Sequence, residues 1–174
     1  MALFGPDVYV CSNYGNGLDL TMTSANQLTI DTGALLINGR FCIIDPAETL
    51  TVDNGSSGMT EYDLVCVHWK VTANAGTANQ KEETELAIVK GTPAASGATD
   101  PVIANQTIKP GITEAYVPFA RITKDGLTPS VALIVPKVVS DLEFRDSISQ
   151  VAVPVTFNAG TTPSSSTSFG AVTN

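Results

Sequence analysis

The sequence predicts an all-β protein: an antiparallel β-sandwich or barrel of about eight to nine short strands, followed by an extended C-terminal segment. Short runs of alternating or β-branched apolar residues recur along the chain, separated by Gly, Asn, Asp and Ser. Helix signals are nearly absent, and no strand–helix–strand alternation is visible. Apolar residues make up 43% of the 174 residues and charged residues only 15%, which is too apolar for a disordered chain.

The first strands are expected in GLDLTMTSANQLTIDTG (17–33), where apolar residues alternate on either side of the connection TSANQ. The run ALLINGRFCII (34–44) carries Asn38-Gly39 between two apolar stretches. This dipeptide predicts a hairpin because both central residues of a type I′ turn need positive φ. A further strand, ETLTV (48–52), ends at the loop DNGSSG (53–58).

The next strand, residues 62–72, is expected at the centre of a sheet because it is apolar on both faces. One face carries Val65, Val67 and Trp69, which places Trp69 in the core, and the other carries Cys66 and His68. TANAGTANQKEE (72–83) is the hairpin tip, and ELAIVK (85–90) returns. The small residues of KGTPAASGATDP (90–101) form an exit from that strand.

Two strands are expected in YVPFARITKDG (116–126) and TPSVALIVPKVV (128–139), joined by the turn Lys124-Asp125-Gly126. Pro118 and Pro136 place these strands at a sheet edge or at strand ends, because proline cannot donate to the ladder. The only helical turn is expected at SDLEFRDSI (140–148), and a last strand in SISQVAVPVTFNAG (147–160). We therefore predict an N-terminal arm (1–17), a β-module (18–138) and a C-terminal appendage with a Ser/Thr-rich tail (139–174).

Composition excludes several classes of partner. The net charge is −8 and the pI is about 4.4, so we expect no nucleic-acid binding, which depends on Lys and Arg. No stretch approaches the ~20 apolar residues of a bilayer span, and no signal peptide is recognisable, so no membrane insertion is expected. Three cysteines without a CxxC pair argue against a disulfide framework and a thiolate zinc site, and indicate buried thiols made in a reducing cytoplasm.

Residues with catalytic potential do not form a recognisable catalytic pattern. His68 and Cys66 lie two apart on one strand, so their side chains run parallel and do not point at each other. The glycine-containing loops precede no helix and lack the lysine of a phosphate cradle. The acidic cluster 82–85 lies at a hairpin tip, where a solvated face is the natural interpretation, and Asp53-Asn54 lacks the spacing of a calcium loop. We predict a protein that is not an enzyme and has no cofactor or metal.

The order of the strands resembles the β-rich module found near the N-terminus of many bacteriophage and prophage baseplate, tail-fibre and receptor-binding proteins. The resemblance covers residues 18–138 and rests most on the string KGTPAAS. The first matching piece is a G-x-x-x-I-N-G turn at Gly33, Ile37, Asn38 and Gly39, and the second is a Y-D-x-V strand at Tyr62, Asp63 and Val65. The KGTPAAS exit at residues 90–96 is the third, and an L/F-A-x-I/V strand at Phe119, Ala120 and Ile122 is the fourth.

This resemblance implies a non-enzymatic structural component of a virion, assembled in the host cytoplasm and acting by self-association, with a trimer favoured and other virion proteins as partners. A chain low in charge and rich in β-branched residues suits such an oligomer. The strand SQVAVPVTF can dock on a neighbouring subunit, because an unpaired strand edge invites another strand. Its docking residues would be Val151, Val153, Val155 and Phe157.

The alternative is a carbohydrate-binding or adhesin-like β-sandwich domain that binds a host surface glycan directly. Glycan sites use exposed aromatic platforms, and the chain has one Trp and four Tyr. Trp69 lies among apolar neighbours, and Tyr116 is the tyrosine selected as a surface or receptor contact. Binding to a glycan that is lost in Tyr116→Ala would favour this alternative over a purely structural role.

Overall fold

Strands dominate the computed structural model, which describes residues 8–73 and 80–138. No helix occurs among the described residues, and the all-β prediction is confirmed. The described chain holds eleven strands, more than the eight to nine expected. They are β1 (Val8–Cys11), β2 (Leu20–Ser24), β3 (Gln27–Ile30), β4 (Gly33–Ile37), β5 (Arg40–Ile44), β6 (Glu48–Thr51), β7 (Thr60–Ala73), β8 (Gln80–Val89), β9 (Glu114–Asp125), β10 (Thr128–Leu133) and β11 (Lys137–Val138).

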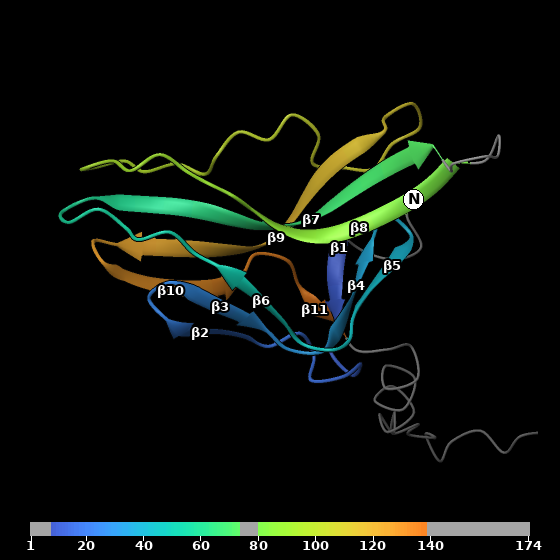
Figure 1. Cartoon of the computed structure of the whole chain (residues 1–174), viewed down its shortest axis with the longest axis horizontal. Helices are drawn as coiled ribbons and strands as arrows, with labels where there is room; N and C mark the ends of the chain where they lie inside the picture. Colours follow the sequence, from blue (N-terminus) through green and yellow to red (C-terminus); the bar gives the residue numbers. More distant parts are fainter. Residues whose placement is uncertain (1–7, 74–79, 139–174) are drawn as a thin grey trace, which may run out of the picture.

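The strands form three sheets (Figure 1). The long sheet has the order β10-β9-β7-β8, the terminal sheet β11-β1-β4-β5, and the small sheet β2-β3-β6. All named pairs are antiparallel except β1 with β11. The long sheet runs along the longest axis of the molecule, and β2 of the small sheet contacts β10 at its edge. The strand 62–72 is central, as predicted, because β7 lies between β9 and β8.

All three sheets contribute to one hydrophobic core. Val10 and Leu35 come from the terminal sheet, Leu28 and Ile30 from the small sheet, and Phe119 from the long sheet, and all five are fully buried. Alternation along each strand is what directs these side chains inward. Trp69 is 3% exposed and belongs to the same cluster, as its apolar neighbours predicted.

The Asn38-Gly39 hairpin is confirmed. Asn38 has φ 48° and Gly39 φ 82°, the pair of positive values that a type I′ turn requires, and β4 and β5 pair from Ile37↔Arg40 onward. The Asn38 side chain also accepts a hydrogen bond from the Ile108 backbone N–H at 2.9 Å. This turn therefore also anchors the connection between β8 and β9.

The prediction for Pro118 was wrong, because β9 is an internal strand between β10 and β7. The register explains how proline is tolerated there. Val65 pairs with Ala120 but Cys66 with Pro118, so Phe119 is an extra residue in a β-bulge beside the proline. A β-bulge already interrupts the hydrogen-bond ladder at this point. The absence of an N–H on Pro118 therefore costs no additional ladder hydrogen bond.

The predicted N-terminal arm contributes to the folded module. Residues 8–11 form β1, which lies between β4 and β11 and places Val10 in the core. The helical turn predicted at 140–148 and the docking residues Val151, Val153, Val155 and Phe157 lie outside the described residues. No helix of the described chain has the length and apolarity needed to cross a bilayer.

Candidate functional site

Tyr116 lies on the outer face of the long sheet, the face turned away from the core, where it stacks on His68. The two residues are directly opposed on β9 and β7, with ring centroids 4.1 Å apart and planes 4° from parallel. The connection 90–113 runs over this face (Figure 1), and Leu64 and Cys66 are buried there although they point away from the core. Tyr116 is half-buried, so only part of the predicted contact residue is open to a partner.

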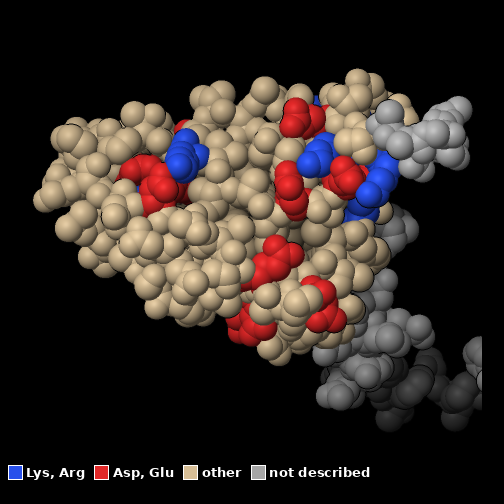
Figure 2. Space-filling view, in the orientation of Figure 1, with Lys and Arg blue, Asp and Glu red and all other residues tan. Residues whose placement is uncertain are grey.

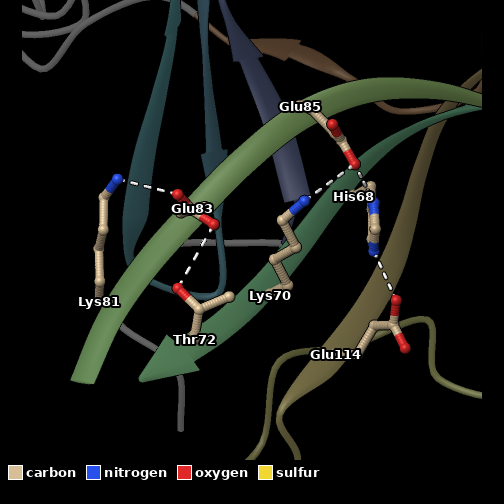
Figure 3. Close-up of polar contacts among 7 residues, drawn as sticks. All are labelled: His68, Lys70, Thr72, Lys81, Glu83, Glu85 and Glu114. Atoms are coloured by element: carbon tan, nitrogen blue, oxygen red, sulfur yellow. Dashed lines mark hydrogen bonds and ion pairs between the residues drawn. The ribbon is translucent and has the colours of Figure 1, made fainter. Parts of the chain in front are cut away.

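His68 bridges two carboxylates (Figure 3). Its Nδ1 lies 2.6 Å from Glu85 Oε1 on β8, and its Nε2 lies 2.7 Å from Glu114 Oε1 on β9. Both nitrogens donate to carboxylates only when the imidazole carries its second proton, because a neutral ring has one N–H. Each ring nitrogen therefore faces a carboxylate oxygen on a neighbouring strand, and Tyr116 covers one face of the ring.

The bridge continues as a row of charged side chains along β7 and β8, which we call the charge ladder. Lys70 Nζ lies 3.4 Å from Glu85, and Glu83 accepts from Lys81 at 2.8 Å and from Thr72 at 3.4 Å (Figure 3). The hydrogen bond from His68, then that from Lys70, holds the pKa of Glu85 below its usual value. Glu83 and Glu85 remain accessible to solvent while they contact Thr72, His68 and Lys70 of β7, whereas Glu82 lies on the other face of β8 and pairs with Arg40.

An open groove of about 510 Å³ lies beside this bridge, and we call it the outer groove. It is lined by residues 88–90 of β8 and the chain after it, by 102–105, and by Glu114 and Tyr116. Two hydrogen bonds hold its rim: the Tyr116 N–H donates to the Asn105 carbonyl at 2.9 Å, and the Asn105 amide donates to the Glu114 carbonyl at 3.2 Å. The volume is that of a small-ligand site.

The groups around the bridge do not form a nucleophile–base pair. Burial raises the pKa of Cys66 to about 12, so it remains a thiol at neutral pH, and its Sγ contacts the Leu64 carbonyl at 3.6 Å. Both nitrogens of His68 are engaged by carboxylates. Within the described residues, no group of three or more His, Cys, Asp or Glu is placed to hold a metal ion. The contacts of His68 with Glu85 and Glu114 can hold these side chains in place at the rim of the outer groove.

A second surface of interest is the outer face of the terminal sheet. Register pairs Leu36 with Phe41 and Ala34 with Ile43, so these four side chains lie on one side of β4 and β5, and we call them the apolar face. Phe41 is 69% exposed and Ile43 is 55% exposed. Cys42 points the other way, because its Sγ bonds the Thr84 side chain. β5 is one of the two edge strands of its sheet.

The sequence predicted Tyr116 as a contact residue but did not single out Phe41 or Ile43. Their signal was present in RFCII, a run apolar at successive positions, which indicates a strand covered on both faces. Comparisons with protein-family models, with curated proteins and with solved structures found no match to this chain. The geometry of these two surfaces is therefore what a functional proposal can rest on.

Proposed function

We propose that the chain is a non-enzymatic structural component of a phage or prophage virion, as an adaptor in a tail, baseplate or fibre or as part of the receptor-binding apparatus. It works by self-association after synthesis in the host cytoplasm. The observation that carries the proposal is the apolar face, with Phe41 and Ile43 exposed side by side on an edge strand. The resemblance of residues 18–138 to phage tail modules supplies the biological setting.

The apolar face favours a protein partner for physical reasons. Large apolar side chains grouped on one sheet face are costly to leave in water, at roughly 25 cal/mol per Å² of apolar surface. β5 also offers the backbone groups that β4 does not use, and an edge of this kind pairs with a strand of another chain. A second copy can meet both needs with an apolar surface and a strand of its own, and in a trimer that contact is head-to-tail, so β5 and the apolar face meet a different surface of the next copy.

Charge distribution supports the same reading. Figure 2 shows mixed acidic and basic groups at the left and upper right of this view, acidic side chains alone in its lower part, and neither kind over most of the surface. With a net charge of −8, copies repel one another weakly at long range, so association needs an uncharged contact area. The apolar face contains no Lys, Arg, Asp or Glu at its four positions.

The test is the solution mass of the full chain at micromolar concentration, measured by light scattering after size exclusion. Wild-type protein is expected as a discrete oligomer, with a trimer favoured, and the pair Phe41→Ser and Ile43→Ser together as a monomer with unchanged strand content. The matched control is Val102→Ser, because Val102 is 96% exposed but lies in the outer groove. A monomeric wild type, or an oligomer that persists in the double variant, contradicts the proposal.

The outer groove favours a second candidate, direct binding of a host glycan. It combines an aromatic ring, a carboxylate and an amide at Tyr116, Glu114 and Asn105, the kinds of groups that sugar rings and hydroxyls contact. Glycan-array binding that survives Tyr116→Phe but is lost in Tyr116→Ala would support it. Tyr14→Ala is the control, since Tyr14 is an exposed tyrosine outside the groove. Binding unchanged in Tyr116→Ala excludes this groove as the glycan site.

A further inference from the structure

A lysine and two carboxylates are buried together on the core face of the long sheet. Lys124 on β9 pairs in register with Glu61 on β7, and Asp63 lies two residues further along the same face of β7. Lys124 and Asp63 are each 1% exposed, and Glu61 is 7% exposed. We call these three residues the lysine cluster. Charged side chains are almost never buried to this degree without a close partner, so their contacts need an explanation.

The contacts within the cluster are close but unequal. Lys124 Nζ donates a hydrogen bond to Glu61 Oε1 at 3.0 Å. The same Nζ lies only 2.6 Å from Asp63 Oδ2, yet that oxygen has no hydrogen-bond partner of acceptable angle. Asp63 Oδ1 accepts a hydrogen bond from the Gly91 backbone N–H at 2.9 Å. The carboxyl group of Asp63 therefore has an amine against one oxygen and an N–H donor on the other.

From this geometry we propose that Lys124 and Asp63 condense to an intramolecular amide, with Glu61 relaying the proton. The Lys124 amine attacks Cγ of protonated Asp63, and the Gly91 N–H stabilises the negative charge that develops on Oδ1. Glu61 takes the proton released by Nζ and delivers it to Oδ2. The Cγ–Oδ2 bond then breaks, and Oδ2 leaves as water. One amine and one carboxylic acid give one amide and one water, and nothing is oxidised or reduced.

Proton positions are compatible with this step. Desolvation lowers the pKa of Lys124, but the close carboxylates of Asp63 and Glu61 raise it by more, so the resting cluster holds an ammonium. Transfer of one proton from Nζ to the adjacent carboxylate yields the amine and the acid, with the same total charge. Contact at 2.6 Å supplies the path for that transfer.

Two physical arguments favour the condensation. A buried ion pair carries a desolvation cost that a neutral amide does not, so the reaction removes two charges from the interior. Groups fixed in contact react with effective molarities on the order of 10⁵–10⁸ M, which offsets the slowness of amide formation in solution. Exclusion of water from the cluster also hinders hydrolysis of the product. The bond would join β7 to β9, the two longest strands, independently of any self-association.

The decisive measurement is the intact mass of the full chain under denaturing conditions. Wild-type protein is expected to be lighter than its sequence by the mass of one water molecule, while Lys124→Arg has its full sequence mass. Trypsin should give a branched product that joins residues 41–70 to 122–137, with no cleavage after Lys124. A wild-type chain at full sequence mass with only linear peptides overturns the proposal and leaves the cluster a permanent ion pair.

Two further variants separate the roles. Asp63→Asn should release ammonia in place of water and reach the same final mass as the cross-linked wild type. Glu61→Gln should stay at its full sequence mass while it folds, as judged by far-UV circular dichroism, and cross-linking at the wild-type rate would overturn the relay role of Glu61. Asp125-Gly126 can also lose water by imide formation, so the branched peptide must survive hydroxylamine, which opens imides but leaves amides intact.

Discussion

Gly91, the second residue of the KGTPAAS string, lies where a side chain cannot be placed. A Cβ added there would meet the backbone of Tyr62, overlapping its carbonyl oxygen and lying 3.0 Å from its carbonyl carbon. Backbone atoms of a paired strand cannot move aside as the end of a flexible side chain can. We therefore expect Gly91→Ala to push the chain after β8 away from β7 and to break the hydrogen bond from the Gly91 N–H to Asp63.

The magnitude follows from these two effects. Loss of a hydrogen bond to a buried carboxylate costs about 1.5–3 kcal/mol. Overpacking against fixed backbone adds roughly 1–3 kcal/mol. We expect Gly91→Ala to lower the free energy of unfolding by about 3–5 kcal/mol. Gly97 lies in the same segment with φ 66° and no atom near an added Cβ, so Gly97→Ala should cost only about 1 kcal/mol, the strain of a left-handed alanine.

The assay is urea unfolding followed by the fluorescence of Trp69, the single tryptophan, at one fixed protomer concentration. With a urea slope of about 2 kcal/mol/M, Gly91→Ala should lower the unfolding midpoint by roughly 2 M and Gly97→Ala by about 0.5 M. Equal losses in the two variants would show that the backbone of Tyr62 does not restrict position 91. A loss below about 1 kcal/mol in Gly91→Ala would do the same, because it would mean that the contact with Tyr62 relaxes freely.

Two other predictions concern the core and the charge ladder. Phe119→Ala removes a fully buried ring and should lower the free energy of unfolding by about 3–5 kcal/mol, while Val102→Ala at an exposed position should change it by less than about 0.5 kcal/mol, both by urea titration. The folded-state pKa of Glu85 is depressed, so its contribution to stability is present above the unfolded value of about 4.3 and is lost as pH falls through the folded value. Acid unfolding of Glu85→Gln should therefore show a shallower loss of stability below about pH 4.3 than wild type, and an unchanged slope would contradict the pairing with His68.

Local sequence signals predicted the parts of the fold that local chemistry determines. Asn38-Gly39 predicted the hairpin correctly because these two residue types adopt positive φ values more readily than others. The alternation around Trp69 gave a central strand with one core face. The prediction from Pro118 of an edge strand or a strand end was wrong. A proline is accommodated inside β9 because a bulge forms there, and the bulge arises only from the register of β9 against β7.

The contacts of charged side chains were harder to predict, because they join residues that are distant in the sequence. Lys124 was assigned to a turn on composition, yet it is buried because Glu61, on another strand, lies opposite it. The acidic residues near the tip of β8 were expected in solvent and Glu85 is exposed, but its contact with His68 across the sheet was not predicted. The alternating His68 and Lys70 in HWK and the glutamates in EETE were the available signal, but which of them pair depends on the register of β7 against β8.

If copies of this chain associate through β5 and the apolar face, hydrogen–deuterium exchange of residues 40–44 should depend on protein concentration. Backbone N–H groups on the free side of an edge strand exchange quickly unless another strand pairs with them. We expect protection of residues 40–44 to rise with protein concentration, while a control peptide from the core of β9 is protected at every concentration. Exchange of 40–44 that is equally fast at all concentrations, in a range where the wild type is assembled, would contradict it.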